Sequence, residues 1–300
     1  MARGVVIGQC LLCRNQAELR DSHFIPQAAY KLARGVGKSP HPIVLQVDSV
    51  VQTSAQVRAH VLCHDCEQCL SQNGEDAFFR YCYRGPGKFK LLHILLSQDP
   101  IEDYEEFAVY AVPKSENSVI EQIGYMGLSV LWKSAAYAWK DTNGTISSIS
   151  LGSPYQEQIR QFLLKAAGFP DNIAIAVQVS DESNRLIAVV GTPATKKWPT
   201  HYLHWIDLCG ITINLLVGAR MPPQIKQLCV LRQGQKCVLV EKRQEAILAM
   251  TYHEHLMALA RRRMLAEEEN FGRRSAEPKG GLRGKRTQKP QFGGPKVGGP

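Results

Sequence analysis

The 300-residue chain lacks an uninterrupted apolar segment long enough to cross a membrane. Its most apolar stretch, residues 118–140, is interrupted by Glu121 and Lys133, which leaves about ten uncharged residues in a row, whereas a membrane helix needs roughly 20. The N-terminus has one arginine and a short apolar run, and it predicts no signal peptide. We therefore expect a cytoplasmic protein with no membrane partner, in which the apolar stretch forms a buried helix.

The sequence also lacks the cysteine density of a disulfide-bonded secreted protein. Nine cysteines in 300 residues is an odd and modest number. Four of them form two Cys-x-x-Cys pairs, and the other five are scattered. This usage is typical of reduced, intracellular thiols with a metal-binding role for the paired ones.

The body of the chain has little net charge. Residues 261–300 hold 11 Lys and Arg and four Asp and Glu, so they carry +7 of the formal net charge of +9. The other residues have 25 basic and 23 acidic side chains, which does not fit a uniformly basic DNA-binding body. Residues 271–300 are rich in glycine and proline, and we expect them to form a disordered basic tail.

Helical and strand-like patterns predict an α+β fold in three parts. Residues 1–90 are expected to form a zinc-binding unit, residues 99–270 a mixed helix and antiparallel-sheet domain without an identifiable role, and residues 271–300 the tail. In the first unit, residues 17–26 read as an extended segment, 27–35 as a helix closed by Gly35, 42–51 and 54–63 as a pair of strands, and the residues after the second cysteine pair as a helix that Gly74 interrupts. In the second unit, residues 99–112 read as a linker and then a strand, the expected helices are 118–140, 155–168 and 243–269, and the other expected strands are 173–179, 185–191, 205–218 and 235–242.

The two cysteine pairs are the strongest chemical signal. Cys10 and Cys13 form the first pair, Cys63 and Cys66 form the second, and 49 residues separate them. The tight turn of each pair presents two thiolates, and Zn²⁺ prefers four such ligands in a closed structural site. Residues 1–90 contain little aliphatic mass, so bound zinc would supply folding free energy that the local core lacks.

Alternatives to this ligand set stay open at the level of the sequence. Cys69 forms a further Cys-x-x-Cys match with Cys66, so it is able to replace one of the four ligands. Four ordinary cysteines near strand ends also fit the pattern. A thioredoxin-like redox pair is disfavoured because neither pair lies between a strand and a helix of a βαβ unit.

His23 has the clearest catalytic pattern. It lies in the segment DSHFIP (21–26), ten residues after the first cysteine pair. A histidine on a strand beside a zinc-bound helix is able to act as a general base toward water, because its pKa is near neutral. The alternative is a histidine that packs in the core or supports the zinc site.

Together these residues resemble the HNH endonuclease superfamily, whose fold is a ββα-metal finger. The resemblance rests on the first cysteine pair, the segment SHFIP (22–26), and the second cysteine pair with Glu67 directly after it. More narrowly, residues 62–84 resemble uncharacterised bacterial HNH-like proteins with a CE…L…NGE signature. Parts of the second unit also resemble that group, namely the spacing of Tyr125, Ser129 and Trp132 and the segments 151–163 and 210–218.

The resemblance implies roles for four residues. His23 matches the histidine that activates water in the superfamily. Ser22 stands where the superfamily commonly has an aspartate that binds a divalent metal, and Asp21 lies next to that position. Glu67 stands where an asparagine usually orients that histidine. The late metal-binding histidine is missing, and Glu75, about two helical turns after Glu67, would replace it as a ligand of Mg²⁺ or Mn²⁺.

Two functions are compatible with these observations. The first is a nuclease of the HNH type that hydrolyses DNA or RNA with His23 as general base and a catalytic Mg²⁺ or Mn²⁺ in addition to structural zinc. The second is a non-catalytic zinc module that binds nucleic acid or a protein partner, and the missing late histidine favours it. The basic tail either neutralises nucleic-acid phosphates or only keeps the chain soluble.

Overall fold

The computed structural model describes residues 4–35, 43–45, 50–52, 55–105, 107–141, 144–145, 148–183, 187–221 and 226–242. The chain divides into two compact units, residues 1–261 and 262–300, and every described residue belongs to the first. The helix expected at 243–269 and the basic tail expected at 271–300 lie outside the described residues. The described part combines helices with sheets, so the predicted α+β class is confirmed.

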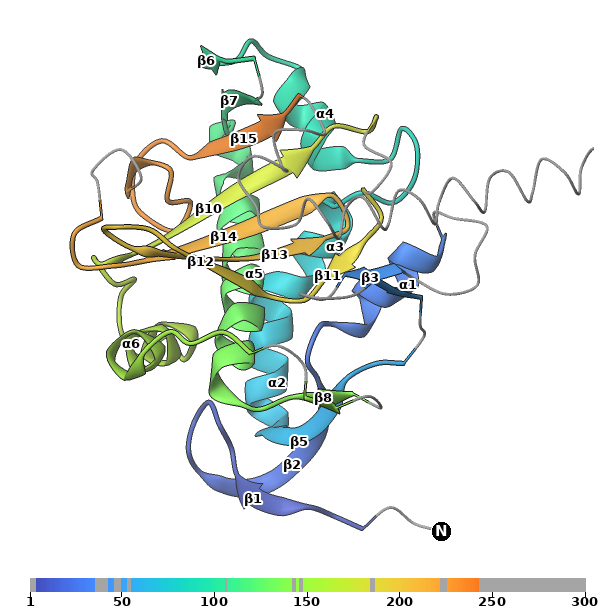
Figure 1. The fold of residues 1–300 in the computed structure, drawn as a ribbon, viewed down its shortest axis with the longest axis vertical. Helices are drawn as coiled ribbons and strands as arrows, with labels where there is room; N and C mark the ends of the chain where they lie inside the picture. The colour runs from blue at the N-terminus through green and yellow to red at the C-terminus, as the bar shows by residue number, and fades with distance from the viewer. Residues whose placement is uncertain are drawn as a thin grey trace, which may run out of the picture. The chain divides into compact units, whose positions relative to one another are not determined.

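A small antiparallel sheet is formed by the first strands of the chain (Figure 1). Its strands are β1 (Ile7–Gln9), β2 (Gln16–His23) and β5 (Arg58–Cys63), in the order β1-β2-β5. A β-bulge between Arg20 and Asp21 shifts the register of β2 against β5. The strand expected at 54–63 therefore pairs with the segment that carries His23 and not with residues 42–51.

Residues 42–51 contribute to a different sheet. Within them, β3 (Ile43–Leu45) pairs with β4 (Val50–Gln52) and, in parallel, with β11 (Val190–Gly191). Helix α1 (Gln27–Gly35) precedes this hairpin, at the position expected. Alternating apolar residues predict a strand but not its partner, which is why the expected pairing of 42–51 with 54–63 is wrong.

The second sheet has ten strands among the described residues, in the order β4-β3-β11-β13-β14-β10-β15-β7-β6, with β12 beside β13. Most neighbours are antiparallel, but β10 pairs with β15 in parallel, as β3 does with β11. The sheet is therefore mixed, whereas an antiparallel sheet was expected. Its other strands are β6 (Glu102–Asp103), β7 (Phe107–Ala111), β10 (Ile173–Ser180), β12 (Ala194–Lys197), β13 (Tyr202–Leu208), β14 (Ile211–Val217) and β15 (Cys237–Glu241).

Residues 205–218, expected to form one strand, are divided between β13 and β14. The two strands form a hairpin whose turn contains Cys209 and Gly210. Both residues have positive φ, 48° for Cys209 and 82° for Gly210, as a two-residue type I′ turn requires. Cys-Gly is not a usual turn pair, so the apolar residues on both sides concealed the turn in the sequence.

The helix after the second cysteine pair is continuous but changes its winding. Helix α2 (His64–Leu70), a π-helical turn η1 (Ser71–Glu75) and α3 (Asp76–Tyr81) follow one another directly. Gly74, which was expected to interrupt the helix, lies in the π turn. Such turns are frequent at functional sites, and this one carries Glu75.

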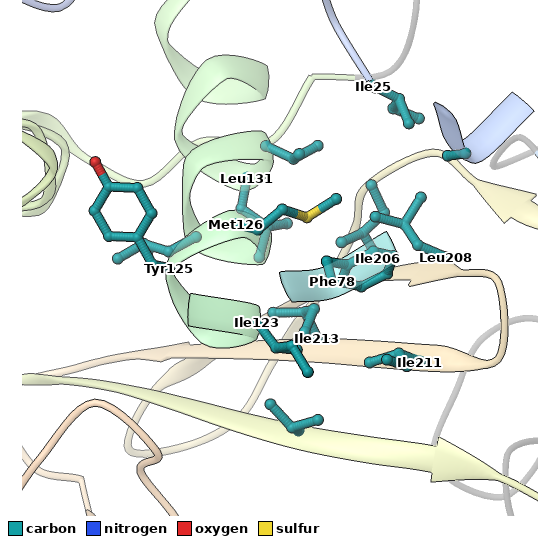
Figure 2. Packing of buried hydrophobic residues seen from close by; sticks show 14 of the residues in the cluster. Ile25, Phe78, Ile123, Tyr125, Met126, Leu131, Ile206, Leu208, Ile211 and Ile213 are labelled. Atoms are coloured by element: carbon teal, nitrogen blue, oxygen red, sulfur yellow. The ribbon is translucent and has the colours of Figure 1, made fainter. Parts of the chain in front are cut away.

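Helix α5 (Asn117–Ala136) is the buried helix expected from the apolar stretch, and its burial runs from Ile120 to Ser134. In Figure 2, Met126 and Phe78 extend over the β13–β14 hairpin, near Ile206 and Ile213. On another side of α5, Tyr125 donates a hydrogen bond to the carbonyl oxygen of the last residue of α6 (Ser153–Leu163) at 2.6 Å. None of the helices within the described ranges is long and apolar enough to span a membrane.

The expected units 1–90 and 99–270 share one core, because Phe78 and Ile213 belong to the same cluster of buried residues. The segment between these units is also structured and contains α4 (Lys90–Leu96). Shorter elements complete the described part: η2 (Lys114–Glu116), β8 (Lys140–Asp141) and β9 (Gly144–Thr145).

Replacing Gly74 with alanine should destabilise the protein. A Cβ at this position would lie 2.7 Å from the Cβ of Met126 and 2.8 Å from its backbone nitrogen, and a backbone atom cannot move aside without shifting α5. We expect a loss of about 1–3 kcal/mol in the free energy of unfolding, measured by urea denaturation. Gly168→Ala is the matched control, because nothing lies within 4 Å of its added Cβ. Equal stability of the two variants would contradict the close packing.

Candidate functional site

Two turns far apart in the sequence bring four cysteines together. Cys10 and Cys13 lie in the turn between β1 and β2, while Cys63 ends β5 and Cys66 lies in the first turn of α2. The antiparallel pairing of β2 with β5 places the two turns side by side, since Leu19 is opposite Cys63. All four sulfur atoms lie within 4.8 Å of one another, so the predicted cluster of Cys10, Cys13, Cys63 and Cys66 is confirmed.

The sulfur geometry fits one metal ion and not a disulfide. The Sγ atoms of Cys13 and Cys63 are 3.8 Å apart. Four sulfurs at about 2.3 Å from a central ion form a tetrahedron with edges of about 3.8 Å, whereas a disulfide needs about 2.0 Å. All four cysteines are free thiols, and three of them are buried. The cluster is therefore able to hold a metal such as zinc in a closed four-sulfur site.

Backbone and thiol groups around Cys10 favour its thiolate form. The Cys66 thiol donates a hydrogen bond to the Cys10 sulfur, the backbone amide of Cys63 donates another at 3.3 Å, and together they lower the pKa of Cys10 to about 4 against the effect of burial. The same thiol contact raises the pKa of Cys66. Metal binding requires thiolates, so these hydrogen bonds, the one from Cys66 above all, favour the form of Cys10 that binds a metal.

Arg160 on α6 connects the first cysteine turn to the rest of the protein. Its side chain is 7% exposed and donates hydrogen bonds to the carbonyl oxygen of Leu12 and, at 2.8 Å, to Glu157. Four thiolates around a divalent ion carry a net charge of −2, and a nearby guanidinium offsets part of it. Nothing in the local sequence singles out Arg160, because only the folded chain brings α6 to this turn.

Cys69 does not belong to the cluster. It lies one helical turn after Cys66, and its Sγ atom is 3.9 Å from the hydroxyl oxygen of Tyr125 and 3.9 Å from the carbonyl oxygen of Leu163. The thiol therefore faces α5 and α6, and the alternative in which Cys69 replaces a ligand is not supported.

His23 ends β2, and Gln56 holds its ring by a hydrogen bond. Its Nε2 atom is 2.8 Å from Oε1 of Gln56. Because that oxygen only accepts hydrogen bonds, Nε2 carries the proton and Nδ1 has the lone pair. Burial lowers the pKa of His23 from 6.5, and the positive charges of Arg58 and Lys133 act in the same direction, against Gln56 and Asp21. The imidazole is therefore neutral at pH 7 and able to accept a proton.

Lys133 is a buried charge next to His23 that lies outside the sequence motifs. It lies on α5, is 4% exposed, and its Nζ atom donates a hydrogen bond to the carbonyl oxygen of His23 at 2.9 Å. Burial lowers its pKa, whereas Glu67 and Glu75 favour its charged form. A single charged residue within the apolar segment 123–136 was the signal in the sequence, because a buried lysine needs partners.

The two predicted carboxylates lie close enough to Lys133 to interact with it. Glu75 is in the π turn, and burial raises its pKa, with Lys133 opposing this effect and Glu67 adding to it. Oε1 of Glu67 is buried and has no hydrogen-bond partner among the described residues. The structure thus brings the partly buried Glu67 and Glu75 near the buried Lys133, and Lys133 joins this group to the backbone of His23.

His23 and Asp21 have other partners in the structure than their predicted roles require. Within the described residues, the hydrogen-bond partner of the His23 ring is Gln56 and not Glu67. Asp21, the predicted ligand of a divalent metal, forms an ion pair with Arg58 on β5 at 2.9 Å. In the part of the chain that the structure describes, the four cysteines are the only group of three or more His, Cys, Asp or Glu side chains close enough to hold a metal. Asp21 and Glu75 therefore do not form a second cluster of that kind.

Comparisons with known proteins found no matching family model, no matching curated protein and no matching solved structure.

Removing one cysteine ligand should release the metal and weaken the fold. We expect one metal ion per chain by native mass spectrometry, and its loss in Cys63→Ser together with a large drop in melting temperature, since metal binding supplies folding free energy. Cys209→Ser is the control, because Cys209 is also a buried cysteine but lies outside the cluster. A metal-free chain that is fully folded would overturn the assignment.

Proposed function

We propose that the four cysteines bind structural Zn²⁺ and that the chain hydrolyses phosphodiester bonds of nucleic acid, with His23 as general base. The support for zinc is the set of four sulfur donors at tetrahedral spacing, which suits Zn²⁺ better than hard cations. Such a closed site leaves no position for substrate or water, so zinc would act on the fold and not on the reaction.

One observation carries the proposal of catalysis. A neutral histidine ends a strand that is fixed beside the zinc cluster, and its tautomer is set by Gln56. The helix that begins at the same cluster carries two partly buried carboxylates. This is the arrangement of base, helix and acidic groups that the resemblance to HNH endonucleases implies.

The residues of the chain would share the chemistry as follows. Nδ1 of His23 accepts a proton from the attacking water as the water oxygen bonds to phosphorus. The ester P–O bond on the opposite side of phosphorus breaks, and the departing oxygen takes up a proton from solvent water. Gln56 keeps the proton on Nε2, and Lys133 holds the backbone of His23 in place. Glu75 and Glu67 would hold Mg²⁺ or Mn²⁺, which supplies a Lewis acid. Mg²⁺ is commonly bound by one or two carboxylates together with substrate phosphates, so a cluster of three protein ligands is not required.

A second candidate function has its own support. Lys133 already offsets part of the negative charge of Glu67 and Glu75, and Asp21 is paired with Arg58. Carboxylates whose charge is compensated within the protein attract a metal less strongly. A zinc-stabilised module that binds nucleic acid or a protein partner without cleaving it is therefore the alternative.

Cleavage assays with His23→Ala decide between the two functions. If the chain is a nuclease, cleavage of DNA or RNA should require added Mg²⁺ or Mn²⁺ and should fall about 10²–10⁴-fold in His23→Ala, with metal content unchanged. His60→Ala is the control, because His60 is an exposed histidine on the neighbouring strand β5. Absence of cleavage with either metal, or cleavage that survives His23→Ala, would support the binding module.

The pH dependence of cleavage should reflect the lowered pKa of His23. The base is active when neutral, and its pKa is lowered from the usual 6.5, so log kcat/KM should begin to decrease at a lower pH than for an ordinary histidine. Arg58→Gln removes a positive charge that lowers this pKa, so the decrease should begin at a higher pH. A decrease that does not move in Arg58→Gln would argue against His23 as the titrating group.

A further inference from the structure

A segment after the π turn concentrates positive charge in an otherwise nearly neutral body. Residues 77–98 contain four Lys and Arg and no Asp or Glu. They form the end of α3, the turn that follows it, and α4. The charges are Arg80, Arg84, Lys88 and Lys90, and all four side chains are exposed.

These side chains line a depression. It has a volume of about 710 Å³ and is lined by residues of this segment alone, including the four cations and His93, with no carboxylate among them. A second depression of about 630 Å³ shares Arg80 and Arg84 and continues to Lys31 on α1, with Asp76 as its acidic residue. The two depressions thus form one track with arginines at their junction.

The turn that forms the track is anchored to the core. The backbone amide of Tyr83 donates to the carbonyl oxygen of Cys209 at 3.0 Å, and that of Gly87 donates to Glu182 at 2.9 Å. The Nζ atom of Lys90 is 3.0 Å from the hydroxyl oxygen of Tyr81. The cations are therefore presented from a fixed backbone, which reduces the entropy lost on binding.

We propose that this track binds the phosphate backbone of a nucleic-acid strand. Arginine donates paired hydrogen bonds to phosphate, and lysine adds a point charge. Most residues that line the first depression are cationic or polar, which suits a chain of anions, and the shared arginines allow neighbouring phosphates to be held in both depressions. The choice of nucleic acid as occupant rests on the proposed function, but the residues are different from those of the His23 site.

The test is fluorescence anisotropy with labelled single-stranded DNA, duplex DNA and RNA, using the full chain and a series of salt concentrations. Arg84→Gln/Lys88→Gln should weaken binding roughly tenfold per lost contact near 0.1 M salt, and should reduce the slope of log K against log salt by about one per contact. Each single variant should weaken binding about tenfold and reduce the slope by about one. Melting curves check that the variants are folded.

Arg220→Gln is the matched control. Arg220 is exposed and follows β14, whose Val217 is opposite Ile173 at the start of β10. The track lies toward the other end of β10, where Glu182 contacts Gly87 and His93. A strand of this length spans roughly 25 Å, so Arg220→Gln removes the same charge far from the track and should leave affinity within about twofold.

The outcomes separate this proposal from the proposed function. Loss of binding in Arg84→Gln/Lys88→Gln but not in Arg220→Gln supports the track, even if no cleavage is found. Unchanged affinity in the double variant overturns it, even if His23 proves catalytic. Binding of the chain to vesicles of anionic lipid, with the same sensitivity to Arg84→Gln/Lys88→Gln and no affinity for nucleic acid, would also overturn it.

Discussion

Helix α5 packs so closely against the π turn and against β14 that a methyl group added at the contacting glycines would not fit. The position of the candidate site depends on this close contact. Gly74 of the π turn meets Met126 of α5, and a Cβ at Gly127 of α5 would overlap the side chain of Ile213 on β14. Interiors of this density transmit small shifts and do not absorb them. The helix that carries Glu67 and Glu75, the large sheet and Lys133 are therefore held in one arrangement.

The buried ammonium group of Lys133 explains why charged residues are tolerated in this core. Removing a charge from water is costly, and the cost is offset when the group is paired and hydrogen-bonded. Lys133 has a hydrogen bond to the carbonyl oxygen of His23, and the charges of Glu67 and Glu75 favour its charged form. Loss of any one of these groups would reduce this compensation, so the group links the stability of the fold to the geometry around His23.

The four-cysteine cluster and Lys133 act on opposite ends of the same strand. The cluster joins the turn before β2 to the end of β5, and Lys133 fixes the other end of β2 at His23. A strand held at both ends presents its terminal histidine in one orientation. A base that is already oriented loses little entropy when a substrate arrives, and this supports the proposed role of His23 without involving zinc in the reaction.

The sequence by itself determined the features that depend on local patterns. Cys-x-x-Cys spacing identified all four members of the cluster, apolar periodicity identified α5 and α6, and alternation identified β10 and β15. Only the tertiary structure decided which strands pair, that Gln56 and not Glu67 contacts His23, and that Arg160 reaches the first cysteine turn. The physical reason is that a cysteine pair, a helix or a strand leaves its own pattern in the local sequence, whereas the partners that it packs against leave none there. A buried charge such as Lys133 is stabilised by partners that lie far apart in the chain, and folding alone brings them together.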